Sequence, residues 1–315
     1  MKGELLTLAA LAMFSTNIIL TRVAAARLSL NAGFLIVVSV NIAFAALLFG
    51  VQQATRHDTL RWDSQGVVLF ALAGLFATYL GRWFIMESIA RLGPAKASAF
   101  QISSPLFTFL IAWLFLGERL RATAVLAMAL TAAGLLLVSL SGMQPSAVAG
   151  ADSTGPKPGR VRRARAGLKT WLRSGVLLAV GSSAAYAVGN VLRGAAIRQW
   201  NEAVLGALIG ALAGIALHLM FGTDHVNVLR SLRGADRTGV VLFAFSGVLT
   251  ISAQMCVIVA MRATPVAVVA LITLCTPLLV FPLSYFLLRN DEGINGRTLM
   301  GAVLTLAGIS AIILL

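Results

Sequence analysis

The sequence predicts an all-α polytopic membrane protein whose ten transmembrane helices form two inverted five-helix repeats. Its 315 residues are 59% apolar and only 11% charged, with a mean hydropathy of +0.91. A soluble domain carries about a quarter charged residues to cover its surface. At roughly 20 apolar residues per membrane-spanning helix, the chain has room for about ten spans. In addition, motifs of the first half recur in the same order in the second half.

Ten apolar windows are long enough to cross a bilayer. They cover residues 5–25, 32–51, 66–89, 94–116, 122–141, 172–193, 203–222, 238–261, 265–288 and 298–315. Lys2 before the first window resembles the start of a signal peptide, but the apolar run that follows is too long for a signal-peptide core. We therefore expect residues 5–25 to form the first transmembrane helix.

One segment differs from the rest in composition. Residues 142–171 are rich in proline, glycine, lysine and arginine, and they divide the windows five and five. Such a composition cannot bury enough apolar surface to offset the entropy lost on ordering. The sequence therefore predicts a first five-helix repeat at 1–141, a basic flexible linker at 142–171 and a second repeat at 172–315.

The two halves share short motifs at matching positions. The string GVVLFA occurs at 66–71 and again at 239–244, and TAAG at 131–134 matches TLAG at 305–308. Arg22 and Arg193 occupy equivalent places near the ends of the first and sixth windows. Because five is odd, two repeats that fold alike must enter the membrane from opposite sides. Inverted repeats of this kind are typical of secondary transporters.

The stretch GPAKASAFQISSPLFTFLIAWLFLGERL at 93–120, followed by TAAGLLLV at 131–138, resembles the EamA family of the drug/metabolite transporter superfamily. The resemblance extends over nearly the whole chain. It implies ten helices around a central cavity, lined mainly by helices 1, 3, 4, 6, 8 and 9. It also implies export or exchange of small metabolites, with cytoplasmic termini.

Two prolines are predicted to break helices near the bilayer midplane. Pro105 and Pro277 follow Pro94 and Pro265, which open the fourth and ninth windows, by about half of the hydrocarbon thickness. Each removes the backbone bond to the residue four positions earlier. Broken helices at this depth build substrate sites in transporters. The alternative is a packing kink in which a neighbouring hydroxyl satisfies the freed carbonyl.

Polar side chains near these prolines and on the first, third and sixth helices are the predicted substrate-binding residues. Arg82 is the most informative, because a guanidinium inside a membrane is costly unless it meets water or an anion. We expect Arg82 to bind a substrate carboxylate. The alternatives are that it forms a fixed ion pair or that its side chain snorkels to the membrane surface. Snorkelling is also the alternative for Arg193. The complete set is Asn17, Tyr79, Arg82, Gln101, Ser104, Tyr186, Asn190, Arg193, Thr273 and Thr276. Glu118, after the fourth window, is expected to cap a helix or fix a loop.

Absent motifs limit the function further. The chain has no phosphate-binding GxxxxGK[ST] loop and no cluster of His, Cys or acidic residues, so we predict no cofactor, no metal and no enzymatic activity. The net charge of +14 is expected to serve topology and lipid headgroup contacts rather than nucleic acid.

We predict a multi-pass secondary transporter of a bacterial inner membrane, moving a small polar or amphipathic metabolite by alternating access. Its partners are the substrate and membrane lipids, and the oligomeric state stays open, with a monomer compatible with the sequence. A lipid-modifying membrane enzyme and a passive channel are the alternatives. The orientation stays open, because the excess of Lys and Arg after odd-numbered windows comes from the linker.

Overall fold

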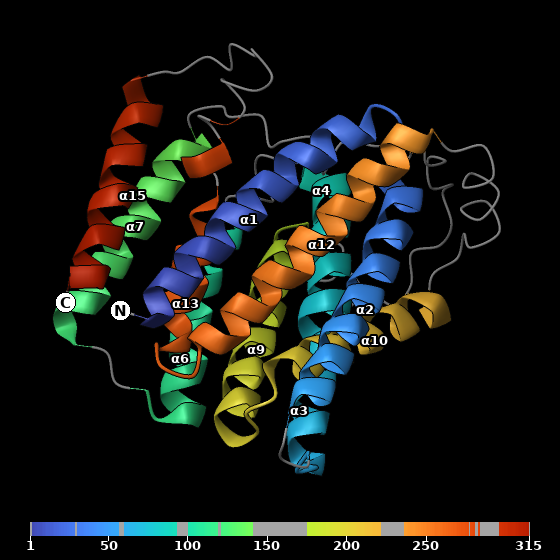
Figure 1. The fold of residues 1–315 in the computed structure, drawn as a ribbon. Coiled ribbons are helices and arrows are strands. Elements are labelled where there is room, and N and C mark those ends of the chain that lie inside the picture. Colours follow the sequence, from blue (N-terminus) through green and yellow to red (C-terminus); the bar gives the residue numbers. More distant parts are fainter. Residues whose placement is uncertain are drawn as a thin grey trace, which may run out of the picture.

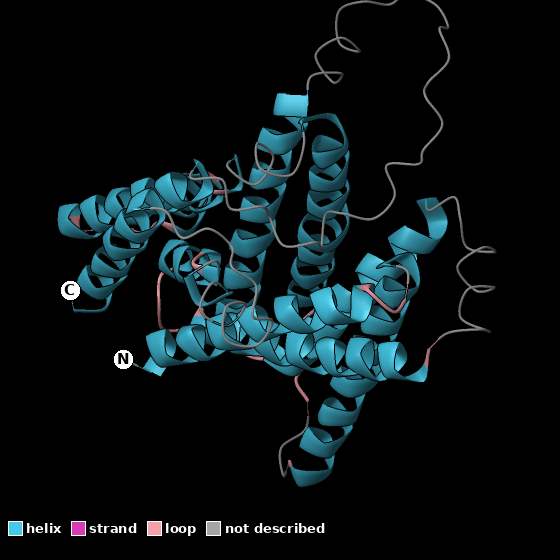
Figure 2. Ribbon diagram, turned by 90° about the horizontal axis from the view of Figure 1, so that it is seen from above, coloured by secondary structure: helices cyan, strands magenta, loops and turns pink. Residues whose placement is uncertain are grey.

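The computed structural model describes residues 2–28, 30–56, 60–92, 100–118, 121–140, 175–221, 236–276, 278–280, 283 and 296–314. These residues are almost entirely helical, and they contain no strand (Figure 2). The predicted linker at 142–171 and Pro277 lie outside the described residues.

Helical segments occur in all ten predicted windows. In the first half they are α1 (Lys2–Ala25), α2 (Leu30–Thr55), α3 (Ser64–Ala73), the π-helical η1 (Gly74–Leu80), α4 (Gly81–Leu92), α6 (Ser104–Leu116) and α7 (Ala122–Leu140). In the second half they are α9 (Gly175–Gln199), α10 (Ala203–Phe221), α12 (Arg237–Ala260), α13 (Val266–Leu274) and α15 (Gly296–Leu314). The start of α1 and the end of α15 lie on the same side of the molecule (Figure 1).

The outside of the helix bundle is apolar. Large side chains such as Leu114, Phe115 and Leu126 are 69%, 74% and 71% exposed. Six described helices are long and apolar enough to cross a membrane, and the others are shorter apolar helices. Exposed apolar residues in this number suit a lipid environment rather than water, so the protein is a multi-pass integral membrane protein.

The two halves pack against each other in a two-fold pattern. α1 lies along α12, and the equivalent α9 lies along α3 and α4 (Figure 1). In the same way, the contact of α2 with α12 matches that of α10 with α3, and the contact of α1 with α13 matches that of α9 with α6. α7 and α15 are equivalent to each other and pack together. The fold is therefore two interlocked five-helix repeats, as predicted.

Equivalent glycines make equivalent close contacts. Phe70 and Phe243, the fifth residues of the two GVVLFA strings, are each 1% exposed. A Cβ atom built on Gly33 would lie 2.5 Å from Cε1 of Phe243, and one on Gly206 would lie 2.5 Å from Cε1 of Phe70. Each ring thus needs a glycine on the facing helix, which explains why the string recurs.

The helices of the fourth and ninth windows are interrupted beside the predicted prolines. Ile102 and Ser103 form a turn, and Pro105 lies in the first positions of α6, where its missing N–H costs nothing. α13 ends at Leu274. Nearby hydroxyls satisfy carbonyls at these breaks. The carbonyl of Phe100 accepts from Ser103 Oγ (2.6 Å) and Ser183 Oγ (2.8 Å), and that of Thr273 accepts from Thr276 Oγ1 (2.6 Å). The roles of Pro105 and Pro277 as helix breakers at a substrate site stay predictions.

Candidate functional site

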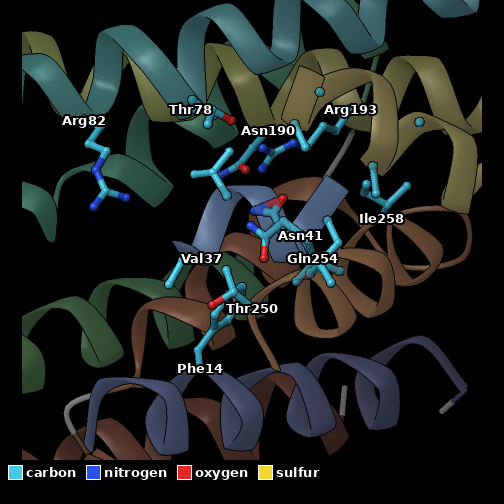
Figure 3. A pocket seen from close by; sticks show the side chains of 18 of the residues that line it. Phe14, Val37, Asn41, Thr78, Arg82, Asn190, Arg193, Thr250, Gln254 and Ile258 are labelled. Atoms are coloured by element: carbon cyan, nitrogen blue, oxygen red, sulfur yellow. The ribbon is translucent and has the colours of Figure 1, made fainter. Parts of the chain in front are cut away.

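A cavity of about 380 Å³ lies between the two halves of the molecule. Its lining comes from α1, α2 and the α3, η1 and α4 segment of the first half, and from α9, α10, α12 and α13 of the second (Figure 3). A volume of this size is typical of small-molecule sites. Because no single half forms it, any relative movement of the halves changes its shape.

Arg82 marks one end of the cavity. It is the second residue of α4, directly after the π-helical η1, and its Cζ lies 4.2 Å from the centre of the Phe34 ring. Phe34 in turn packs edge-on against His218, with 4.8 Å between ring centres. The Arg82 side chain is exposed, so this end of the cavity reaches the surface of the described structure. The aromatic face stabilises the cation without neutralising it.

Arg193 marks the other end of the same wall, with Thr78 and Asn190 between the two arginines (Figure 3). Arg193 lies on α9 and is only 7% exposed. Tyr186 and Asn190 share its helical face and also line the cavity. Within the described structure the guanidinium lies inside the molecule and does not extend to the surface.

No acidic side chain is found among the described residues that line the cavity. Glu118 and Glu202, which lie near the end of α9, are bonded to Arg198 and Arg56. Asp236 is bonded to Arg27 at the opposite face of the protein. The described cavity therefore has two guanidiniums and no carboxylate to balance them.

The facing wall offers oxygen atoms as acceptors. In the orientation that satisfies its hydrogen bonds, the Asn41 amide nitrogen donates to the carbonyls of Gly247 (2.7 Å) and Val37 (3.0 Å), which leaves its oxygen free. Thr250 Oγ1 donates to the Ser246 carbonyl at 2.8 Å, and Thr273 Oγ1 donates to the Val269 carbonyl at 2.9 Å. Their hydroxyl oxygens keep lone pairs for a ligand.

Six of the ten predicted binding residues line the cavity: Asn17, Arg82, Tyr186, Asn190, Arg193 and Thr273. The Asn17 side-chain oxygen accepts from Ser246 Oγ, so its amide N–H groups remain available.

The other four, Tyr79, Gln101, Ser104 and Thr276, do not belong to its lining. Gln101 donates to Ser182 Oγ at 2.7 Å, and Ser182 Oγ donates to the Gly81 carbonyl at 2.7 Å. These two bonds hold the segment around Gln101, in the fourth window, against α4 and α9. Binding roles for all ten residues stay predictions.

Several lining residues were not among those predicted. Asn41 and Gln254 are single amides inside the apolar windows 32–51 and 238–261, a signal that could have identified them. Thr78, by contrast, was expected in the lining because it shares a helical face with Arg82, and it lies on the π-helical η1. Phe34, which carries the cation–π contact, is indistinguishable in sequence from a lipid-facing residue.

The face beyond Arg193 is closed by bonds between the halves. Arg56 at the end of α2 pairs with the buried Glu202 at 2.6 Å. Glu118 pairs with Arg198, and its two carboxylate oxygens accept from the Val266 N–H at 3.0 and 3.1 Å. The Glu118 carboxylate thus caps the N-terminus of α13, as expected for a capping residue.

The opposite face carries a more exposed ion pair. Arg27 and Asp236 lie 3.2 Å apart, with 50% and 41% of their side chains exposed. The hydrogen bond from the Arg27 guanidinium holds the pKa of Asp236 below its ordinary value. Asp236 also accepts from the Thr238 N–H, which caps α12.

Apolar helices from all ten windows, arranged as two interlocked repeats around a shared polar cavity, are typical of membrane transporters. Family comparison leads to the same class. The EamA-like transporter family matches residues 1–140 and 173–314, and the chain belongs to this family.

Comparison with curated proteins gave no match. A solved structure described only as "Crystal structure of protein" has a TM-score of 0.69 to this chain at 17% identity. The similarity covers 99% of this chain and 96% of that one. At this identity the likeness shows the shared fold.

Proposed function

We propose that this protein is a secondary transporter that exports or exchanges a small anionic or zwitterionic metabolite by alternating access. The observation that carries the proposal is the cavity between the halves, where two arginines meet amide and hydroxyl groups without a carboxylate among the described lining residues. An unbalanced guanidinium in a low-dielectric site attracts an anion. Arg82 at the exposed end is the residue that first meets the substrate.

The unequal ends of the cavity support alternating access. Bonds between the halves close the face beyond Arg193, whereas Arg82 is exposed at the other end. In inverted repeats, rocking of one half against the other exchanges the open and closed faces around a central site. Breaking the Glu118 and Glu202 pairs is the step that would open the second face.

The membrane we propose is a bacterial inner membrane. Spans made of apolar α-helices satisfy their own backbone hydrogen bonds, as inner-membrane proteins do. The break before Pro105 in the fourth window and the end of α13 at Leu274 in the ninth allow those segments to bend as the halves move.

The test is uptake and counterflow in reconstituted vesicles, using a panel of labelled carboxylates and amino acids. For a substrate of the wild type, Arg82→Gln is expected to reduce transport by about tenfold or more, since a hydrogen bond to a charged group contributes about 1.5–3 kcal/mol. Arg82→Lys should restore part of the rate, because it keeps the charge and loses the planar fork. Arg121→Gln removes an exposed arginine outside the cavity and serves as the matched control.

Thermal stability in detergent is measured beside transport. A stable Arg82→Gln variant with impaired transport supports the substrate-anchor role. An unstable variant would instead indicate a structural ion pair, since a stranded buried partner costs about 3–5 kcal/mol. Unchanged transport in a stable variant, or no solute movement by the wild type, would overturn the proposal.

A further inference from the structure

The described residues show no structural role for Arg193 in holding the helices together. It is 7% exposed, lines the cavity, and makes no hydrogen bond or ion pair with any side chain in the described part of the chain. Its neighbour on the helix, Arg198, is by contrast bonded to Glu118 and to the Met261 carbonyl. Leaving a buried guanidinium without a counter-charge is costly, and no described lining residue supplies one, which makes Arg193 a site for a ligand anion.

Arg82 and Arg193 are well separated along their shared wall of the cavity (Figure 3). Gly189 of α9 packs against Ala77, and Ser182 of α9 bonds to the Gly81 carbonyl, which sets these two antiparallel helices in register. Because the helices are antiparallel, Arg82 is level with the residue just before Ser182. Arg193 follows about eleven residues or more along α9, which corresponds to about 16 Å or more along the helix axis.

The space between the arginines is lined by neutral groups. Thr78 and Asn190 separate the two guanidiniums along their wall, and Asn41, Thr250 and Gln254 face them (Figure 3). A zwitterion could place its carboxylate on one arginine, but its ammonium would then approach the second cation with only neutral oxygens nearby. A ligand with an anionic group at each end meets both guanidiniums and leaves its middle among amides and hydroxyls.

We propose that Arg193 is a second anion anchor and that the cargo carries two anionic groups separated by a short chain. This inference rests on the proposed transport function and names its substrate class. Each guanidinium can hold a carboxylate or phosphate by two parallel hydrogen bonds. The difference in depth between Arg82 and Arg193 makes the protein select the distance between the two charges.

The test uses purified full-length protein in detergent at pH 7.5, with thermal unfolding as the measure of binding. The probes are unbranched α,ω-dicarboxylates of three to eight carbons, and monocarboxylates of the same lengths. Dicarboxylates of intermediate length are expected to stabilise the protein at concentrations at least about tenfold lower than those needed for monocarboxylates of the same length. Arg193→Gln should abolish this preference for dicarboxylates while weak monocarboxylate binding at Arg82 persists. Arg82→Gln should also abolish the preference, because it removes the other anchor.

Stability without ligand separates an anchor from a structural cation. If Arg193 lacks a partner, the ligand-free Arg193→Gln protein should melt at the same temperature as the wild type or higher. A lower melting temperature for this variant would overturn the proposal. If the Gln variant cannot be purified, Arg193→Lys serves instead, and it should bind dicarboxylates more weakly than the wild type.

Equal stabilisation by monocarboxylates and dicarboxylates in the wild type would overturn the assignment, as would stabilisation by neither series. The proposed function has a separate test. Counterflow of monocarboxylates or amino acids in vesicles, without preference for dicarboxylates, would retain the transporter and reject the second anchor. Absence of movement of any solute would reject both.

Discussion

Glu118 lies in the short connection after α6 of the first repeat and bonds to α9 and α13 of the second repeat. Its carboxylate is 6% exposed and bonds to Arg198 of α9 and to the N–H that opens α13. Glu118→Gln keeps an acceptor for that N–H and loses the charge. We expect a decrease of about 1–3 kcal/mol in the free energy of unfolding, because Arg198 is a third exposed and can be rehydrated.

The measurement is denaturation of the purified protein in detergent. Glu118→Ala should destabilise more than Glu118→Gln, since the alanine also leaves the α13 terminus uncapped. Asp236→Asn is the matched control, because it removes the charge from an exposed ion pair and keeps a capping side chain. If the control lost as much stability as Glu118→Gln, burial would not explain the role of Glu118.

Asp236 makes the stability depend on pH in a defined direction. Its pKa is lowered in the folded protein, chiefly by the hydrogen bond from Arg27, so its contribution is complete above the pKa of the unfolded chain. The contribution is lost as the pH falls through the lowered pKa.

The melting temperature of Asp236→Asn should therefore lie slightly below that of the wild type at pH 6. The two values should converge as the pH is lowered past the ordinary range of aspartate, near 3.8. A difference that grew on acidification would contradict the assignment of Arg27 as the partner.

At the scale of elements, the crossing of α7 and α15 depends on one glycine from each helix. A Cβ atom on Gly134 would lie 2.6 Å from the Thr305 nitrogen and 2.7 Å from the Gly301 oxygen. One on Gly308 would lie 2.8 Å from the Ala127 oxygen and 2.9 Å from the Thr131 nitrogen. These atoms are backbone and cannot move aside, so small residues let the two helices approach closely.

Gly134→Ala and Gly308→Ala are each expected to destabilise the protein by about 1–3 kcal/mol, as overpacking does. Because the two contacts are related by the pseudo-two-fold, the losses should be similar. Gly50→Ala on α2 is the control, since its Cβ would meet no atom within 4 Å. The measurement is thermal unfolding in detergent, and a neutral Gly134→Ala variant would contradict the close crossing.

At the scale of the whole molecule, the two repeats are held by their contacts in the membrane. Apart from α4, which packs on α9, every helix of the first half packs on at least two helices of the second. We expect the predicted linker to be dispensable for this assembly. Replacing 147–165 by a Gly/Ser spacer of equal length should leave an inserted protein with an unchanged melting temperature. Failure of the second repeat to insert would show that the segment has a structural role.

The sequence by itself predicted the class, the ten helices and the duplication, because each depends on composition and repetition. Long apolar runs with few charges must lie in a membrane whatever their partners are. The GVVLFA and TAAG strings recur because the same ring-on-glycine and glycine-on-backbone contacts form in each half. Arg82 and Arg193 were predicted to matter because their burial in a membrane is costly in any arrangement.

Only the tertiary structure decided which polar side chains share the cavity. A soluble helix reveals its inner face by apolar periodicity, but a membrane helix is apolar toward lipid and toward the core alike, so its rotation is not encoded in that pattern. Gln101 and Asn41 are comparable single amides in apolar windows, yet Gln101 bonds to Ser182 and Asn41 lines the cavity. The packing of one repeat on the other sets these rotations, and it places Arg82 and Arg193 at the two ends of one wall.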